Sequence, residues 1–245
     1  MVIGFVGSGN MARALAVGWG EPALFTDGGS GRAGALAADV GGEAVSSNRE
    51  LGKRAELLVL AHKPTQLEAV AAEVGSAGLV LSLLGAVTLA QLEAVYPGAR
   101  LVRAMPNTAV AVREGVTCVC GEEVAEVEEL LGRVGVVVRL PERLMDAATA
   151  VSGVAPAYVA LIAEAWIDAA VAQGIPAGQA GELVGASLAG AAALLRSRGM
   201  DTLAVRREVT SPGGMTARGL RALEQAGLRS AFASAAGAVA GSSPK

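Results

Sequence analysis

The stretch VIGFVGSGNMARAL, residues 2–15, decides the fold of this chain. A short hydrophobic run leads into the turn GSGNMA, residues 7–12, and a segment with the composition of a helix follows. Glycine at the first and third positions of such a turn permits a tight bend and lets the backbone approach a pyrophosphate. The start of the helix would also offer free N–H groups to the phosphates. We therefore predict a dinucleotide-binding turn here.

Beyond this turn, β-rich runs alternate with segments of helical period as far as Leu140. The alternation predicts an α/β, Rossmann-type, doubly wound domain with a mostly parallel sheet. Thr88 and Gln91 have the spacing of a capping box at the start of one helix. The expected strands are Val2–Gly7, Ala23–Asp27, Ala55–Ala61, Leu79–Leu84, Arg100–Met105, Gly115–Cys120 and Val136–Leu140. The expected helices are Asn10–Trp19, Gly31–Val40, Thr65–Val74, Leu89–Val95 and Val124–Val134.

The pattern changes near Pro141, and long Ala-rich segments follow. We predict a dinucleotide-binding domain over residues 1–143 and an all-α domain over residues 144–245. The helix that starts near Pro156 is apolar nearly all round, which is typical of a buried helix. A small helical domain has little room to bury it, so we expect a subunit interface there. The expected helices are Pro156–Gln173, Pro176–Arg198, Leu203–Glu208, Ala217–Gln225 and Leu228–Ala240.

Composition excludes several classes of function. Hydrophobic residues make up 52% of the 245 residues, and the net charge of −3 comes without a basic block, which argues against nucleic acid as a partner. The longest uncharged run, residues 74–92, is interrupted by Gly, Ser and Thr, and the N-terminus has no basic region before its apolar run. Two cysteines and one histidine provide few soft metal ligands. We expect a cytoplasmic protein that binds neither membrane nor metal.

The residues after the second expected strand bear on the choice of cofactor. That strand ends at Asp27, and an acid about 20 residues after the Gly-rich turn usually holds a ribose 2′-hydroxyl, which favours NAD. Ser30 and Arg32 follow closely, and these side chains are suited to a 2′-phosphate. The choice between NADPH and NADH is therefore open from these residues.

Few residues are suited to acid–base catalysis. Lys245, the last residue, is the only lysine in the helical half, and His62 lies in a loop just after an expected strand. Glu164 and Asp168 share a helix face, which is more typical of a solvated or interface stripe than of a catalytic pair. A reduction that needs little help from a protein acid or base, such as hydride transfer to a protonated imine, fits this inventory best.

The helical half is interrupted by TSPGGMT, residues 210–216. Two glycines and a proline in succession disfavour a helix, so the segment is either a plain turn between helices or a functional loop. A Gly-Gly pair directly before a helix can curl the backbone so that its N–H groups face an anion. With a dinucleotide-binding turn upstream, we predict that this loop binds the substrate.

These segments together resemble Δ1-pyrroline-5-carboxylate reductase, nearly from end to end and in the same order. The resemblance is carried by GFVGSGNMARAL (4–15), LAHKPTQL (60–67), the block from GAVTLAQL to PNTAVAVREGVT (85–117), MDAATAVSGVAPAYVALIAEAWIDAAVAQGIP (145–176) and VRREVTSPGGMTARGLRALE (205–224). It implies the reduction of 1-pyrroline-5-carboxylate to L-proline with NADPH or NADH, the last step of proline biosynthesis. It also implies homodimers formed by interlocking helical domains, with higher homo-oligomers in some members.

The resemblance implies a role for individual residues. Thr216 would be the catalytic residue, with its hydroxyl on the ring nitrogen of the substrate, and the substrate carboxylate would lie against the backbone of the Gly-Gly loop. The implied substrate-binding residues are Ser211, Gly213, Gly214, Met215 and Thr216. The expected cofactor-binding residues, including the open pair of alternatives after Asp27, are Gly7, Ser8, Gly9, Asn10, Met11, Asp27, Ser30, Arg32, Asn48, Ala61, Lys63, Pro64 and Asn107.

Some positions depart from the family pattern. His62 replaces the usual Val of the V-K-P segment, Val154-Ala155 interrupts the usual S-G-S-G-P-A-Y, and Arg207 replaces an acid. A related reductase of cyclic imines or small acids, or a non-catalytic cofactor-binding paralogue, are the alternatives that these departures leave open.

Overall fold

The computed structural model describes residues 1–240 and divides them into two compact units, one of Met1–Pro156 and one that begins at Ala157. The division falls in the first turn of helix α8 (Ala155–Ala172). Helix α7 (Met145–Ser152) belongs to the first unit, because its Met145 packs with Cys118 and Cys120 of the sheet. The sequence predicts a boundary between the two domains after residue 143, where the alternation of strands and helices ends. The division into compact units lies after Pro156.

The first unit is built on an eight-stranded sheet with the order β3-β2-β1-β4-β5-β6-β7-β8. All neighbouring strands are parallel except β6 and β7, which are antiparallel. The predicted doubly wound, mostly parallel sheet is confirmed. The strands are β1 (Ile3–Val6), β2 (Leu24–Thr26), β3 (Glu43–Ala44), β4 (Leu57–Leu60), β5 (Leu79–Ser82), β6 (Arg100–Pro106), β7 (Gly115–Gly121) and β8 (Gly135–Arg139).

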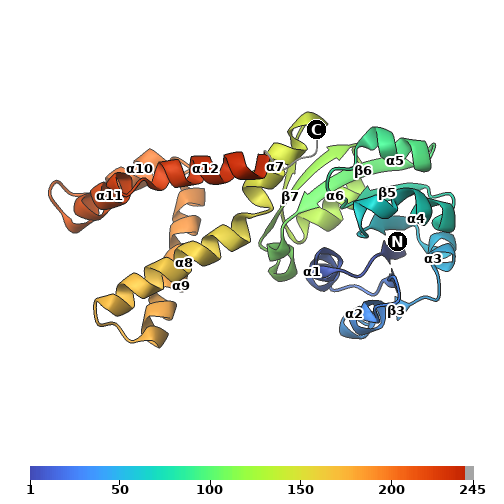
Figure 1. The fold of residues 1–245 in the computed structure, drawn as a ribbon, viewed down its shortest axis with the longest axis horizontal. Helices are drawn as coiled ribbons and strands as arrows, with labels where there is room; N and C mark the ends of the chain where they lie inside the picture. Colours follow the sequence, from blue (N-terminus) through green and yellow to red (C-terminus); the bar gives the residue numbers. More distant parts are fainter. Residues whose placement is uncertain (241–245) are drawn as a thin grey trace. The chain divides into compact units, whose positions relative to one another are not determined.

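Helices cover both faces of this sheet and bury a separate apolar cluster on each (Figure 1). One face carries α1 (Asn10–Trp19), α2 (Arg32–Val40) and α6 (Ala125–Gly132). The other carries α3 (Asn48–Arg54), α4 (Leu67–Val74) and α5 (Leu89–Val95). Short 3-10 turns complete the unit: η1 (Pro64–Gln66), η2 (Thr108–Val112) and η3 (Glu142–Leu144).

Side-chain caps set the start of two of these helices. The predicted capping box at the start of α5 is confirmed, with Thr88 and Gln91 each accepting a backbone hydrogen bond from the other. Ser47 caps α3 by accepting from the backbone N–H of Glu50 at 3.2 Å, which explains a helix that sequence periodicity alone did not predict.

The strand order places a crevice at the start of the sheet. Strand β1 pairs with β2 on one side and with β4 on the other, so the chain reverses its direction of winding there. In open α/β sheets, ligands bind outside the carboxyl ends of the strands at such a point. Gly7, Asp27 and Ala61 directly follow these three strands.

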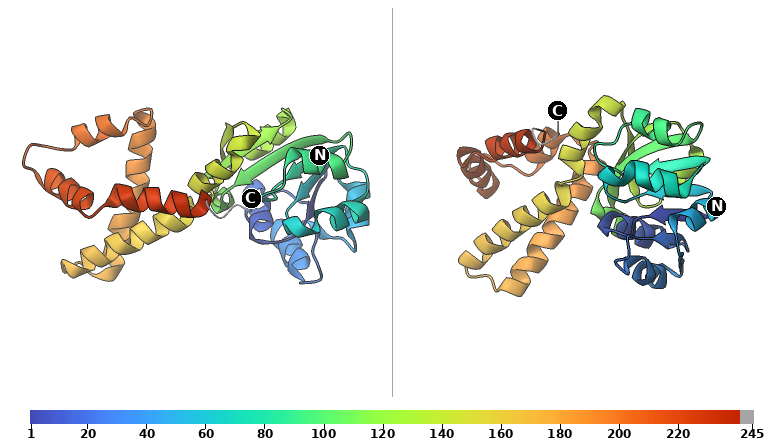
Figure 2. Two further views of the ribbon diagram at one scale, coloured as in Figure 1. Left: turned by 45° about the horizontal axis from the view of Figure 1, so that its top comes forward. Right: turned by 45° about the vertical axis from the view of Figure 1, so that its right-hand side comes forward.

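The second unit is entirely helical over its described residues, as predicted (Figure 2). Helix α11 begins at Met215 and not at the predicted Ala217, because Gly214 already has the extended conformation of an N-cap residue. Helix α8, which the sequence predicts to lie at a subunit interface, has no buried side chain among the described residues of the single chain. The helices are α8, α9 (Ala177–Ser197), α10 (Thr202–Glu208), α11 (Met215–Gln225) and α12 (Leu228–Ala240).

Candidate active site

Gly7 joins the ends of three strands. Its φ of +97° lies in the left-handed region, and a Cβ added there would lie 2.6 Å from the carbonyl oxygen of Ala61. Its N–H donates to the carbonyl oxygen of Thr26 at 3.1 Å. The positive φ and the close approach of Ala61 both exclude a side chain at this position. The first glycine of the turn is therefore required by the backbone and the packing, whether or not a ligand is bound.

Gly9 has a different role, because it opens space. It is the N-cap residue of α1 with φ −78° and ψ −173°, and a Cβ added there would meet nothing within 4 Å. The N–H groups of the first helical turn, at Asn10 and Met11, have no acceptor within the helix. Ser8 is buried and donates its hydroxyl to the carbonyl oxygen of Thr26 at 3.0 Å, which holds the turn in place. The turn thus fits a dinucleotide pyrophosphate.

A cavity of about 310 Å³ adjoins this turn. It brings together three of the predicted cofactor residues, Gly7, Asp27 and Asn48, from three separate elements. Ser30, Arg32, Lys63 and Asn107 do not line it. The lining residues are Val6, Gly7, Asp27, Gly28, Asn48, His62, Gln66, Ala69, Val70 and Glu73.

Asp27 is held by its own loop. One carboxylate oxygen accepts from the N–H groups of Gly29 at 2.7 Å and Ser30 at 3.0 Å. The other accepts from the hydroxyl of Ser30 at 3.1 Å and the N–H of Ala33 at 2.8 Å. These bonds, the one from Ala33 foremost, lower the pKa of Asp27 below its usual value.

Asn48 connects strand β2 to helix α4. Its amide oxygen accepts from the hydroxyl of Thr26 at 2.6 Å, and its amide nitrogen donates to the carboxylate of Glu73 at 2.7 Å. The amide is therefore held in one orientation, and the carboxylate of Glu73 is held beside the cavity. The sequence did not indicate Glu73, because a single Glu on a helix belongs to no motif.

His62 lies against the same cavity. Its Nδ1 is 2.9 Å from the carbonyl oxygen of Lys63, and that contact requires a proton on Nδ1 if the ring is neutral. Its Nε2 is buried without a hydrogen-bond partner among the described residues. Burial lowers the pKa of His62 below its usual 6.5, so the ring is neutral near pH 7.

The remaining predicted cofactor residues have mainly structural contacts. Ala61 donates its N–H to Val6, and Pro64 occupies the first turn of η1 after the exposed Lys63. Asn107 is buried, and its amide donates to the carbonyl oxygen of Ser152 and accepts from the N–H of Val116. These contacts fix the loops at the carboxyl ends of β4 and β6.

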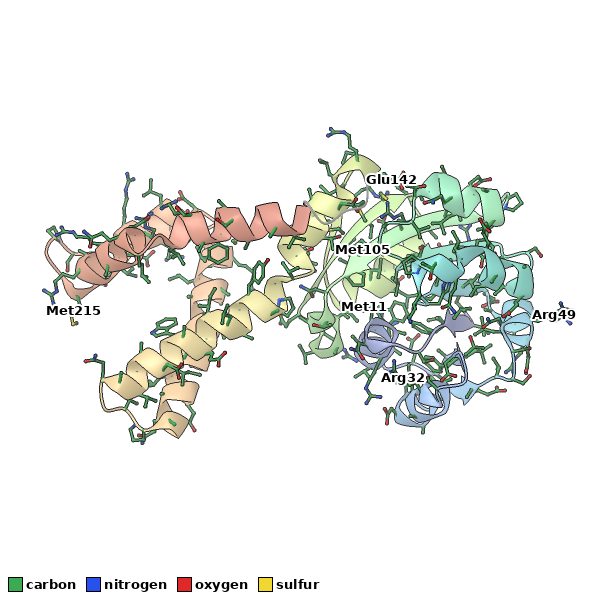
Figure 3. All side chains as sticks on the ribbon, viewed as in Figure 1. Met11, Arg32, Arg49, Met105, Glu142 and Met215 are labelled. Carbon is green, nitrogen blue, oxygen red and sulfur yellow. The ribbon has the colours of Figure 1, made fainter. Side chains whose placement is uncertain are left out.

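The loop TSPGGMT in the second unit is a tight turn that leads directly into α11. Gly213 has a φ of +70°, and a Cβ on Gly214 would lie 2.3 Å from Oγ of Ser211. The N–H of Gly214 donates to the carbonyl oxygen of Ser211 at 3.1 Å. Met215 and Thr216 follow in the first turn with exposed side chains, and Figure 3 shows Met215 at the N-terminal end of α11. Their N–H groups have no acceptor within the helix.

The fold, the Gly-rich turn of residues 7–12 and the loop TSPGGMT together define a class of protein. This class is the NAD(P)-dependent oxidoreductases with an N-terminal Rossmann-type domain and a helical C-terminal domain. Residues 2–84 match the family model for NADP oxidoreductase, coenzyme F420-dependent. Residues 142–244 match the model for pyrroline-5-carboxylate reductase dimerisation.

Individual relatives identify the family. The chain is 34% identical to a pyrroline-5-carboxylate reductase of Methanosarcina acetivorans, over 95% of this chain and 93% of that protein. It is 38% identical to one of Synechocystis, over 76% of this chain and 73% of that protein. The chain belongs to the pyrroline-5-carboxylate reductase family.

A solved structure agrees with this membership over both units. The crystal structure of Plasmodium falciparum pyrroline carboxylate reductase with NADP bound is similar to this chain with a TM-score of 0.83 and 28% identity. The likeness covers 99% of this chain and 97% of that one. The predicted family and the predicted NAD(P)H-dependent oxidoreductase activity are thereby confirmed.

Proposed function

We propose that this protein reduces 1-pyrroline-5-carboxylate to L-proline with NADPH or NADH, the last step of proline biosynthesis. The observation that carries the proposal is the family match over both units, which includes the dinucleotide-binding turn and the substrate loop. The cofactor, when bound, supplies the hydride from its reduced nicotinamide ring. The protein residues orient the two reactants and exclude water.

The proposed substrate-binding residues are Ser211, Gly213, Gly214, Met215 and Thr216. Two features of the loop support this assignment. A Cβ on Gly214 would lie 2.3 Å from Oγ of Ser211 and 3.2 Å from its carbonyl oxygen, so a larger residue there would displace the Ser211 side chain. The N–H groups at the start of α11 have no acceptor within their own helix. A carboxylate at this helix start would gain hydrogen bonds and a favourable helix dipole.

Thr216 is the proposed catalytic residue. Its hydroxyl is exposed in the first turn of α11 and makes no hydrogen bond with any described residue, so it is free to contact the ring nitrogen. A hydroxyl there would orient the C=N bond of the substrate and would remain hydrogen-bonded to the nitrogen of the product. No lysine lies near this loop in the sequence to serve as an alternative acid.

We further propose a cytoplasmic homodimer formed through the second unit. The stretch Glu142–Ala172 is long and apolar enough, by composition, to cross a membrane, and only 6% of its most apolar window is buried. The dimerisation model covers the same residues. A second copy of the chain therefore accounts for this apolar surface without a membrane.

One set of assays tests the proposal. Absorbance of the reduced cofactor is followed with pyrroline-5-carboxylate for the wild type, Thr216→Ala and Thr216→Ser. We expect Thr216→Ala to lower kcat at least tenfold, Thr216→Ser to retain most activity, and both variants to bind cofactor like the wild type. Wild-type turnover in Thr216→Ala would remove Thr216 from the mechanism. No turnover by the wild-type protein with either cofactor would refute the proposed function.

A further inference from the structure

The loop between β2 and α2 has its anion-binding groups already occupied. The start of a helix after the second strand is where a Rossmann-type domain would bind an extra phosphate on the adenosine ribose. Here the N–H groups of Gly29, Ser30 and Ala33 and the hydroxyl of Ser30 all donate to Asp27. The carboxylate of Asp27 thus takes the place that such a phosphate would need.

A second carboxylate, that of Glu73 on α4, lines the same cavity. Glu73 on α4 accepts from Asn48, and the bond from Thr26 to Asn48 fixes that arrangement. Among the described residues that line the cavity, none is Lys or Arg, and His62 is neutral near pH 7 because burial lowers its pKa. The lining therefore carries two carboxylates and no compensating cation.

Arg32, Arg49 and Lys63 lie close in the sequence to residues of the lining, and none of the three lines the cavity. Arg32, at the start of α2, does not line the cavity and makes no hydrogen bond or ion pair with any described residue. Arg49 on α3 is exposed, and Figure 3 shows its side chain extending outward from the fold. Ser30, the other predicted phosphate ligand, is bonded to Asp27.

We infer that the adenosine end of this cavity selects NADH over NADPH, with Asp27 and Glu73 as the specificity-determining residues. A ribose 2′-hydroxyl is a hydrogen-bond donor, which suits the carboxylate of Glu73, because Glu73 accepts one hydrogen bond among the described residues whereas Asp27 already accepts four. A 2′-phosphate is an acceptor that carries negative charge, so it would face like charges and would have to displace Asp27 from its loop. The inference deepens the proposed function by choosing its cofactor and rests on the cofactor-binding half of it.

Direct binding tests the inference without any substrate. The full-length protein is titrated with NADH and with NADPH at 0.15 M salt, and cofactor fluorescence or calorimetry gives both Kd values. We expect NADH to bind at least tenfold more tightly. Equal affinities, tighter binding of NADPH, or no binding of either cofactor would overturn the inference.

Variants identify the residues responsible. Asp27→Asn and Glu73→Gln keep the shapes of the side chains and remove one negative charge each, and we expect each to lower the preference for NADH at least threefold. Glu73→Gln keeps the inference testable if Asp27→Asn disturbs the loop. Glu68→Gln, on α4 but outside this cavity, is the matched control and should leave the ratio unchanged. An unchanged ratio in Glu73→Gln would remove that residue from the selection.

Arg32→Ala tests the opposite assignment. We expect it to leave the ratio of the two Kd values within about twofold of the wild type, because Arg32 lies outside the cavity lining. A specific loss of NADPH affinity would instead assign Arg32 as a phosphate ligand and overturn the inference. Selective NADH binding without turnover of pyrroline-5-carboxylate would leave the inference intact and refute the proposed function. Turnover of pyrroline-5-carboxylate together with tighter binding of NADPH than of NADH would support the proposed function and overturn the inference.

Discussion

The two units of this protein treat their apolar side chains in opposite ways. In the first unit, β1, β2, β4 and β5 are buried along their whole length, and two clusters of helices cover the sheet. In the second unit, the buried hydrophobic residues among those described are Ala180 and Val184. Its large apolar side chains are instead exposed, including Val159, Leu161, Trp166, Leu183, Leu203, Leu223 and Phe232.

This difference separates a unit that completes its core within one chain from one that does not. Tyr158 on α8 and Phe232 on α12 pack edge to face with ring centroids 6.5 Å apart. They line an apolar groove of about 230 Å³ together with Leu161, Ile162 and Leu228. Exposed apolar surface of this extent is unfavourable in water, and a second copy of the chain would bury it.

The largest expected effect breaks the second unit and spares the first. In Leu161→Glu, a charge replaces a side chain that is 65% exposed in one chain and lies in the proposed dimer surface. We expect the protein to become monomeric and to lose nearly all turnover, because an unpaired charge in a desolvated interface costs several kcal/mol. Analytical ultracentrifugation measures the mass, and cofactor titration checks that the first unit still binds.

Val17→Glu is the matched control for that experiment. Val17 lies on α1 of the first unit and is 39% exposed, so the same charge is placed on an apolar position outside the proposed interface. We expect the mass and the turnover of the wild type. Wild-type mass in Leu161→Glu, or dissociation in Val17→Glu, would contradict the assignment of the dimer surface to the second unit.

The next effect strains the first unit and leaves the interface intact. Gly7→Ala introduces a Cβ at a φ of +97° and 2.6 Å from the carbonyl oxygen of Ala61. We expect the free energy of unfolding to fall by about 2–4 kcal/mol and cofactor binding to weaken. Urea denaturation at a fixed protein concentration measures the first change, and calorimetry the second.

Gly9→Ala provides the comparison within the same turn. Its Cβ would meet no protein atom within 4 Å, so we expect a loss of at most about 1 kcal/mol in stability. Cofactor affinity should still fall at least tenfold, because the space next to the backbone is where a pyrophosphate would approach. If both variants lost the same stability, the distinction between a packing glycine and a binding glycine would be wrong.

Much of the first unit was predictable because its elements are set locally. Four-residue buried strands such as β4 and β5 appear in the sequence as apolar runs between turns, because a strand of a parallel sheet is buried on both faces. Strand β3 was missed because it has two exposed residues at the edge of the sheet. Helix α3 was missed because its single buried residue, Leu51, leaves no apolar periodicity.

The site was predictable from the sequence only where the backbone conformation requires glycine. Gly7 and Gly9 follow from the spacing of the turn, and the Gly213-Gly214 pair indicated a loop before a helix. The position of Glu73 beside Asn48 depends on the packing of α3 and α4, which no local pattern encodes. The occupation of the α2 start by Asp27 depends on the path of the loop through Gly29 and Gly31, both with positive φ.

The smallest expected effect is the pH dependence of stability that arises from the partly buried imidazole ring of His62 in the first unit. Because burial lowers the pKa of His62, the folded chain binds fewer protons than the unfolded chain just below pH 6.5. Stability from this residue is therefore fully present above the unfolded pKa and is lost as pH falls toward the folded pKa. His62 is the only histidine, so few other groups titrate in that range.

His62→Val makes this term measurable, because it places the usual family residue in the same loop. Between pH 7 and pH 5.5 we expect the wild type to lose up to about 1 kcal/mol more stability than the variant, as measured by urea denaturation. The carboxylates of Asp27 and Glu73 line the same cavity and would favour a protonated ring, so they limit the size of the difference. Parallel pH curves for the two proteins would mean that their attraction cancels the burial of the ring, and hence that the cavity accepts a positive charge at acid pH.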